Sequence, residues 1–308
     1  MYHYLRAAAA ICLTAFCFSP ALAQSAPAQV VLSQEESAKV DAAAQGALTG
    51  LHVPGMAIAI VRDGTVVYRK AFGVTNLATK AAVQAQTQFE IGSITKQFTA
   101  AAVLQLVAQG KVKLSDPLSK YVPTYRVGRA VTIQQLLNQV SGIPDYTNVK
   151  HFEVIAPKTT PSFERILAMI AGKPLEFAPG TKWKYSNTNY ILLGKVIEVA
   201  SHQPYSTYLF SHVIRPAGMS HTVTMDDEKH LTNFATGYWP KEKGQLSLAP
   251  PFGGGWAGSA GFLVSDLDDM VAWDSAFFGG KIVSPADVVL ATTPGKLKSG
   301  KSTTYGFG

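Results

Sequence analysis

The apolar stretch from Ser93 to Gln109 constrains the fold more than any other feature of the chain. Apolar side chains occupy nearly every position from Phe98 to Val107, so a helix built here has little polar face. A helix that is apolar all round is stable only when it is buried. Gly110 follows in the position where a glycine commonly ends a helix. We therefore expect a buried helix over 93–109.

The start of this helix carries Ser93-Ile94-Thr95-Lys96, the only Ser-x-x-Lys in the chain. Residues three apart share a helix face, so the hydroxyl of Ser93 and the amine of Lys96 lie on the same side. A serine hydroxyl becomes a good nucleophile only when a base takes its proton. Burial and the positive end of the helix dipole both lower the pKa of a lysine toward a value at which it can be that base. The backbone N–H of Ser93 can also point at a developing oxyanion.

The pattern by itself also fits an ordinary pair of surface side chains. Its position at the start of a buried helix, directly after Gly92, places the interpretation of Ser93 as a nucleophile with Lys96 as its base on an equal footing with that alternative.

A second candidate segment is Tyr185-Ser186-Asn187, which precedes another apolar helical stretch. A tyrosine on a tight turn can hold its hydroxyl over a cleft, and a neighbouring lysine ammonium would lower its pKa toward a value useful in proton transfer. Asn187 can hydrogen-bond both a substrate amide and Lys96. The alternative is a plain turn with a half-buried tyrosine. The tripeptide alone does not decide, because Tyr146-Thr147-Asn148 repeats its pattern.

The N-terminus has the pattern of a secretory signal peptide over 1–23. Arg6 provides the positive start, residues 7–18 the apolar run, and Ala21-Leu22-Ala23 the small-residue cleavage site. A membrane anchor is the alternative, but the run is too short to span a bilayer. We expect a periplasmic or secreted protein with no transmembrane segment after cleavage. Cys12 and Cys17 both lie in the signal, so the mature chain would have no disulfide and no cysteine nucleophile.

Composition argues against several classes of function. The chain has a formal net charge of +7, but its basic residues are scattered and lack aromatic interleaving, so nucleic acid is a poor candidate partner. The charge fits an anionic substrate or envelope, or simply a solvated basic surface. The seven histidines show no metal-ligand spacing, so we expect no metal and no cofactor. The sequence contains no Gly-x-Ser-x-Gly elbow, which argues against an α/β-hydrolase esterase.

The expected elements fall into two groups. A helix over 32–48, with Ser33 and Glu36 as a capping box, precedes two strands over 56–62 and 65–72 that Asp63-Gly64 joins as a hairpin. From Asp116 onward we expect short helices between loops rich in proline and glycine, with no strand pairs. The helices are expected over 132–138, 162–170, 188–201, 205–214, 265–277 (with Ser265 as N-cap) and from Ser284-Pro285 onward.

The C-terminal residues 303–308 read as the start of a strand. A lone hairpin is only marginally stable, so we expect its partner strands to lie beyond Gly308.

Together these segments resemble the serine β-lactamase and penicillin-binding-protein superfamily, in its class C β-lactamase-like branch. The match follows the order of the chain over nearly all of its mature part. The matching segments are Val53-Pro54-Gly55-Met56 with the Asp63-Gly64 hairpin, Phe89 to Lys96, Leu136-Leu137 with Ser141 to Tyr146, Phe177 to Gly194, Pro216 to Met219, and Ala260 to Ser265.

The resemblance implies the fold. It predicts an α/β (α+β) structure of the β-lactamase/DD-peptidase-like type, with an antiparallel sheet flanked by helices and a mainly helical inserted domain. Residues 24–115 and 262–308 would form the α/β domain, incomplete at its C-terminus, and residues 116–261 the helical one.

The resemblance also implies the roles. Ser93 would be the acylated nucleophile, Lys96 and Tyr185 would share base and acid duty, and Asn187 would bind substrate. Which of Lys96 and Tyr185 takes the serine proton stays open. No cofactor is implied.

Two departures from the pattern stand out. Gln139 occupies a position where relatives often carry a histidine. The third element of the family, Lys-Thr-Gly or His-x-Gly on a strand that supplies the second oxyanion donor, is absent up to Gly308; in relatives it follows a segment like Tyr305-Gly306-Phe307-Gly308. The chain is therefore expected to be a fragment lacking half of its oxyanion hole.

Two functional hypotheses remain. The first is an exported serine hydrolase that acts through an acyl-serine intermediate on β-lactams, D-amino-acid peptides or small esters, so that its partner is a small-molecule or peptidoglycan-derived substrate. The second is a non-catalytic envelope protein that keeps the fold to bind peptidoglycan or a partner. The oligomeric state is not readable from the sequence.

Overall fold

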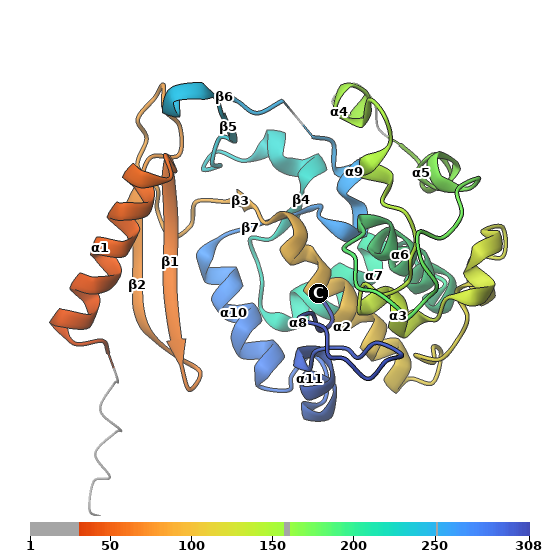
Figure 1. Ribbon diagram of the computed structural model, residues 1–308. Coiled ribbons are helices and arrows are strands. Elements are labelled where there is room, and N and C mark those ends of the chain that lie inside the picture. Colours follow the sequence, from red (N-terminus) through yellow and green to blue (C-terminus); the bar gives the residue numbers. More distant parts are fainter. Residues whose placement is uncertain (1–30, 157–160, 251) are drawn as a thin grey trace, which may run out of the picture. The chain divides into compact units, whose positions relative to one another are not determined.

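Helix α2 (Thr95–Ala108) runs through the middle of the structure (Figure 1), a computed structural model that describes residues 31–156, 161–250 and 252–308. The signal peptide predicted over 1–23 lies outside the described residues. Ten of the helix's side chains are buried, from Thr95 to Leu106. The predicted buried helix is confirmed, although its first turn is a separate 3-10 turn, η1 (Gly92–Ile94). Gly110 adopts φ +71°, the left-handed conformation expected after a helix end.

The hairpin lies on one side of this helix, with residues 267–278 between them (Figure 1). Strand β1 (Gly55–Arg62) pairs antiparallel with β2 (Thr65–Gly73), and the turn residues Asp63 and Gly64 have φ of +50° and +74°. Two positive φ values are what a two-residue type I′ turn requires, so the predicted hairpin is confirmed. Helix α1 (Gln34–Gly50), with the predicted capping box at Ser33, packs on β2, while α10 (Leu267–Phe278) packs on β1 (Figure 1).

Short strands also form where none was expected. Strands β3 (Phe89–Glu90), β7 (Leu263–Ser265) and β4 (Val223–Thr224) make an antiparallel sheet in that order, and β5 (Tyr238–Pro240) pairs with β6 (Leu246–Leu248). The expectation that no strand pairs occur within 116–261 was therefore wrong. Elements of two or three residues are too short to leave an alternating pattern in the sequence.

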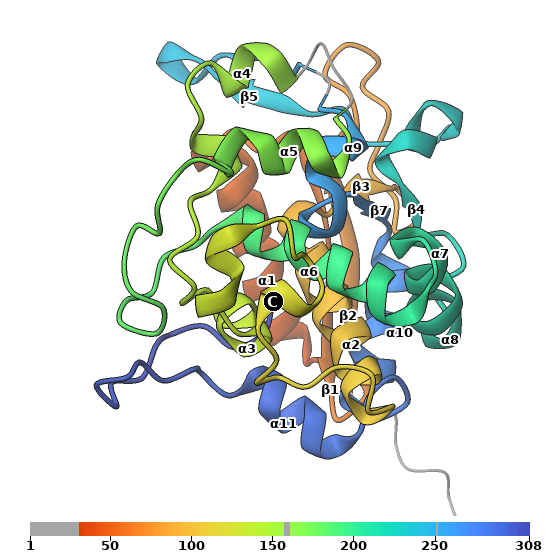
Figure 2. The same cartoon turned by 90° about the vertical axis from the view of Figure 1, so that its right-hand side faces the viewer.

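Short helices make up much of the rest of the described chain, as expected. Thr132 and Ser284 close complete capping boxes, and Pro285 takes the first position of its helix. The elements are α3 (Ile133–Leu137), α4 (Phe152–Ile155), α5 (Phe163–Ile170), α6 (Asn187–Ser201), α7 (Tyr205–Leu209), a π-helical turn η6 (Phe210–Ile214), α8 (Arg215–Ala217), α9 (Gly254–Ala257) and α11 (Pro285–Thr292). Of these, α3, α5, α6 and α7 lie on the side of α2 away from the hairpin (Figures 1 and 2).

Two further local expectations were wrong. The N-cap of α10 is Asp266, whose side chain accepts the N–H of Asp269, because Ser265 is still paired within β7. Residues 303–308 form no strand: Phe307 is buried and its N–H donates to the carbonyl of Ala291 at 2.8 Å, so the segment packs on α11.

Residues 31–308 form one compact unit. The split into domains at 115/116 and 261/262 stays a prediction. Among the described residues, no helix combines the length and apolar character that crossing a membrane requires.

Helix α6 makes a close contact at Gly194 with the turn η9 (Gly258–Ala260). A Cβ at Gly194 would lie 2.2 Å from Ser259 Oγ, which is buried and donates to the carbonyl of Tyr190 at 2.8 Å. Gly194 therefore sets the distance between α6 and the turn.

We expect Gly194→Ala to lower the free energy of unfolding by about 1–3 kcal/mol, because the added methyl overlaps a buried side chain that is already hydrogen-bonded. The matched control is Gly46→Ala in α1, where a Cβ would meet nothing within 4 Å; it should raise stability by about 0.5–1 kcal/mol. Urea denaturation followed by circular dichroism measures both. Equal effects of the two substitutions would contradict the close approach.

Candidate active site

Ser93 stands exposed at the entrance of α2, while Lys96 one turn later is completely buried. The chain reaches Ser93 through β3, after which the N–H of Ile91 donates to the carbonyl of Leu263 at 3.0 Å, and through Gly92 at φ +50°. A positive φ is least costly for glycine, so Gly92 permits the bend that brings the hydroxyl to the surface. The nucleophile candidate thus faces solvent with the amine beneath it.

The amine of Lys96 lies in a cage of polar contacts. Its Nζ lies 2.9 Å from Ser93 Oγ, 3.0 Å from Asn187 Oδ1 and 2.7 Å from the carbonyl oxygen of Ala260. Burial lowers the pKa of Lys96 to about 8, and the charge of Asp145 opposes this fall. The sequence-based expectation of a depressed lysine pKa is confirmed, with desolvation as the main cause.

Tyr185 completes the contact with the serine from the other side. Its hydroxyl donates to Ser93 Oγ at 2.8 Å, and its ring centroid lies 4.8 Å from Lys96 Nζ. Burial raises the pKa of Tyr185; the hydrogen bond with Ser93 opposes this rise, and the Asp145 carboxylate adds to it. The expectation that the pKa of this tyrosine would fall was wrong, because desolvation by burial is the largest influence on it. Tyr185 therefore remains an O–H donor near neutral pH.

Donor counting shows what this arrangement can do. A protonated Lys96 has three N–H donors, enough for Ser93, Asn187 and Ala260. A neutral Lys96 has two N–H donors and one lone pair. The two carbonyl-type oxygens can only accept, so they take the two hydrogens and leave the lone pair facing Ser93 Oγ. Neutral Lys96 is thereby oriented to accept the serine proton, while Tyr185 donates to the same oxygen.

Asn187, the first residue of α6, is held by a residue that sequence reasoning did not select. The carboxylate of Asp145 accepts both the backbone N–H and the Nδ2–H of Asn187, each at 3.0 Å. Asp145 appeared only within the Ser141 to Tyr146 segment, where an acidic residue before a buried tyrosine gives no signal of its own. The carbonyl of Ala260 also escaped notice, because a backbone acceptor leaves no mark in a sequence.

Gln139 and Tyr146 take structural places beside the site. Gln139 Oε1 accepts the N–H of Ser186 at 3.0 Å and Nδ2–H of Asn189 at 2.6 Å, and so supports the turn that presents Tyr185. Tyr146, from the competing tripeptide, is buried and donates its hydroxyl to the carbonyl of Trp256. The structure thus distinguishes the two Tyr-x-Asn segments.

A cavity of about 430 Å³ opens beside Ser93 and Asn187. The other residues that line the cavity are mostly apolar. Glu90 is the acidic residue among the described residues of the lining, and burial and the charge of Glu228 raise its pKa. The apolar lining comprises Tyr146, Phe152, Ala156, Met225, Trp239, Ala249, Pro250, Phe252, Ala257 and Ala260. The cavity can hold an apolar group attached to a carbonyl that lies against Ser93.

The profile of the Beta-lactamase family matches residues 40–308. The chain belongs to this family. It is 30% identical over 247 residues to Protein flp of Staphylococcus aureus (strain MW2), an alignment that covers 79% of this chain and 49% of that protein. The chain thus spans about half the length of the curated relatives it matches first.

Two solved structures of the same superfamily align well. The octameric penicillin-binding protein homologue from Pyrococcus abyssi has a TM-score of 0.76 at 29% identity, covering 88% of this chain and 64% of that one. The D-stereospecific amidohydrolase from Streptomyces sp. has a TM-score of 0.71 at 28% identity, covering 83% and 78%. The predicted resemblance and the predicted β-lactamase/DD-peptidase-like fold class are confirmed.

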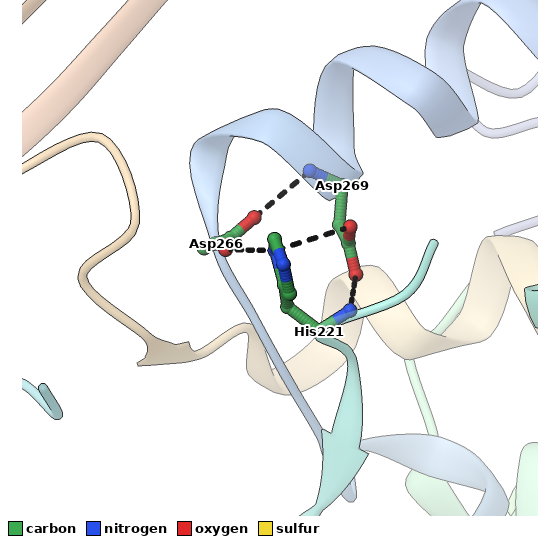
Figure 3. Close-up of side chains that lie close together, drawn as sticks. All are labelled: His221, Asp266 and Asp269. Carbon is green, nitrogen blue, oxygen red and sulfur yellow. Dashed lines mark hydrogen bonds and ion pairs between the residues drawn. The ribbon is translucent and has the colours of Figure 1, made fainter. Parts of the chain in front are cut away.

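A second polar cluster in this Beta-lactamase-family chain lies apart from Ser93 in the sequence. His221, Asp266 and Asp269 offer side-chain atoms within 4.8 Å of one another (Figure 3). The Asp269 carboxylate accepts the backbone N–H groups of Ser220, His221 and Thr222 at 3.1, 2.8 and 2.6 Å. The Asp266 carboxylate lies 2.8 Å from His221 Nδ1 and accepts the backbone N–H of Asp269 at 2.9 Å. These hydrogen bonds connect the 220–222 turn to the start of α10.

The depressed lysine pKa predicts a pH-dependent stability. Between pH 8, the folded-state pKa of Lys96, and its ordinary value of 10.5, the unfolded chain binds a proton that the folded chain does not. Stability therefore rises with pH across this window. Relative to Lys96→Met, wild type should gain on the order of 3 kcal/mol between pH 7 and pH 10.5.

Urea unfolding of both proteins across this range measures the difference. Lys39→Met, at an exposed lysine on α1, is the control for loss of one ammonium group. A difference between wild type and Lys96→Met that stays constant with pH would show that Lys96 is not desolvated.

Proposed function

We propose that the chain is an exported serine hydrolase that forms an acyl intermediate on Ser93. The observation that carries the proposal is the pair of contacts on one exposed oxygen: Ser93 Oγ lies 2.9 Å from the buried amine of Lys96 and 2.8 Å from the hydroxyl of Tyr185. A base and an acid on the same serine are the minimum for acyl transfer.

In the proposed acylation step, neutral Lys96 accepts the Ser93 proton as Oγ attacks the substrate carbonyl carbon. The backbone N–H of Ser93, at the N-terminal end of its helix, donates to the developing oxyanion. The carbonyl then re-forms and expels the leaving group, which receives a proton from Tyr185 or from the Lys96 ammonium. In deacylation, water attacks the ester carbon and passes a proton to the amine or phenolate that acylation left deprotonated. The bond between that carbon and Ser93 Oγ then breaks, Oγ takes the proton back, and the carboxylic acid is released.

The directions of the two pKa shifts favour Lys96 over Tyr185 as the acylation base. The pKa of Lys96 falls to about 8, so a useful fraction is neutral near physiological pH. The pKa of Tyr185 rises, which makes its phenolate scarce and its O–H available. The most economical assignment is Lys96 as proton acceptor and Tyr185 as proton donor to the leaving group.

The proposed substrates are esters, amides or β-lactams whose acyl part is apolar. The apolar lining of the cavity beside Ser93 supports this choice, and D-amino-acid peptides fall within it because a similar structure is a D-stereospecific amidohydrolase. The periplasm or the extracellular space is the proposed location, which brings peptidoglycan-derived peptides into reach. Fractionation of cells that produce the full chain tests the location.

The nucleophile is tested by covalent labelling. We expect a fluorescent penicillin, or a p-nitrophenyl ester in a burst assay, to acylate wild type and to leave Ser93→Ala unmodified in the mass spectrum. Tyr185→Phe should lower the acylation rate by about 10²–10⁴-fold, because it removes a positioned acid.

Tyr146→Phe is the matched control, since it deletes a tyrosine hydroxyl that contacts the Trp256 carbonyl and not Ser93; its acylation rate should stay within a few-fold of wild type. No labelling and no ester turnover by the full chain would instead favour a non-catalytic envelope protein that binds peptidoglycan or a partner.

The cavity is tested with a series of p-nitrophenyl esters. We expect kcat/KM to rise by about 10-fold or more from the acetate to the phenylacetate, because the ring fills apolar space. Phe252→Ala should remove most of that preference, whereas Phe278→Ala, at an exposed site on α10, should keep it. A flat series in wild type would assign the cavity no part in substrate choice.

A further inference from the structure

Asp145 is a buried carboxylate with every hydrogen bond directed at two neighbours. Its Oδ2 accepts the backbone N–H and the Nδ2–H of Asn187, each at 3.0 Å. Its Oδ1 accepts the N–H of Thr147 at 3.0 Å, which caps the short 3-10 helix over 146–148. An ionised carboxylate can only accept hydrogen bonds, so each oxygen needs a donor beside it.

The requirement of the Asp145 carboxylate for donors determines which way the Asn187 amide points. Either end of an asparagine amide can face a given neighbour, and only its surroundings choose between them. Asp145 takes the NH₂ end, so the carbonyl end of Asn187 faces Lys96 Nζ at 3.0 Å. With the amide reversed, an N–H would compete for the lysine lone pair.

We propose that Asp145 is a positioning residue for acylation: by holding the Asn187 amide in one orientation, it directs the lone pair of neutral Lys96 toward Ser93. The inference rests on the proposed function. The two hydrogens of the neutral amine go to Asn187 Oδ1 and to the Ala260 carbonyl at 2.7 Å. Only the third direction, toward Ser93 Oγ at 2.9 Å, remains for the lone pair.

Asp145 also acts on Lys96 through its charge. The titratable groups that face the amine among the described residues are Asp145 from the loop, Tyr185 before α6 and Tyr190 within α6, the two rings lying 4.8 and 5.6 Å from Nζ. Asp145 is the acidic one, and it raises the pKa of Lys96 against the larger effect of burial. Removing its charge should therefore lower the lysine pKa further.

Asp145→Asn tests the positioning. An amide presents one acceptor and one donor, so it cannot receive the N–H groups of both Thr147 and Asn187 and must set N–H against N–H on one side. With p-nitrophenyl acetate we expect kcat/KM to fall by roughly 10–100-fold, as for loss of a partner that orients a catalytic group. The acid limb of the pH profile should also move to lower pH.

A double-mutant cycle separates positioning from general support of the structure. If Asp145 acts through Asn187, then Asp145→Asn in an Asn187→Ala background should cost less than threefold, because the amide it orients is already gone. Fully additive losses would overturn the proposal. Asp145→Ser is the second variant: it is neutral, yet its hydroxyl can still cap the Thr147 N–H, so it keeps the turn if the amide variant does not fold.

A readout that needs no turnover keeps this inference separate from the proposed function. NMR titration of Lys96 Nζ in ¹⁵N-lysine-labelled full chain should give a lower pKa in Asp145→Ser than in wild type, in samples with equal melting temperatures. An unchanged lysine pKa would overturn the electrostatic influence of Asp145 on Lys96 even in an active enzyme, whereas the double-mutant cycle decides its positioning role. Absence of Ser93-dependent turnover in wild type would overturn the proposed function, and the titration would still decide the influence of Asp145 on Lys96.

Discussion

The burial of one amine governs this structure. Lys96 projects from the buried helix α2 and is inaccessible to solvent, which disfavours its charged form. A buried amine must be surrounded by acceptors, because an unsatisfied polar group in an apolar interior costs more than its hydrogen bonds return. Ser93, Asn187 and Ala260 meet that need, and each comes from a different segment. The contacts of the site therefore replace the water that the Lys96 amine loses on burial.

The packing around α2 brings these acceptors together. Helix α6 lies along α2 and starts at Asn187, so the contact between the two helices places that side chain. Gly194 lets the 258–260 turn approach α6 closely, which presents the Ala260 carbonyl to the amine. The β3–β7 pairing leads the chain into Gly92 and Ser93. Each of these contacts joins segments far apart in the sequence, so the geometry depends on the cooperative fold.

The same burial shifts the pKa values of Lys96 and Tyr185 in opposite directions. One low-dielectric environment lowers the pKa of a cationic acid and raises that of a neutral one. These shifts suit the proposed roles of Lys96 as base and Tyr185 as acid, and both side chains contact the serine oxygen. The negative charge of Asp145 opposes the fall in the pKa of Lys96. Its carboxylate also accepts the Nδ2–H of Asn187, which favours one orientation of that amide.

The sequence by itself determined the elements whose signals are local. The buried helix, the Asp63-Gly64 hairpin, the capping boxes at Ser33 and Thr132, and the pairing of Ser93 with Lys96 at helical spacing all follow from neighbouring residues. The family followed from the ordered set of segments. Only the tertiary structure decided the rest: that the Ala260 carbonyl reaches Lys96, how Asp145 contacts Asn187, and in which direction the pKa of Tyr185 moves. Those outcomes depend on burial and on contacts between residues tens of positions apart, and such distances are fixed by packing, which no local pattern records.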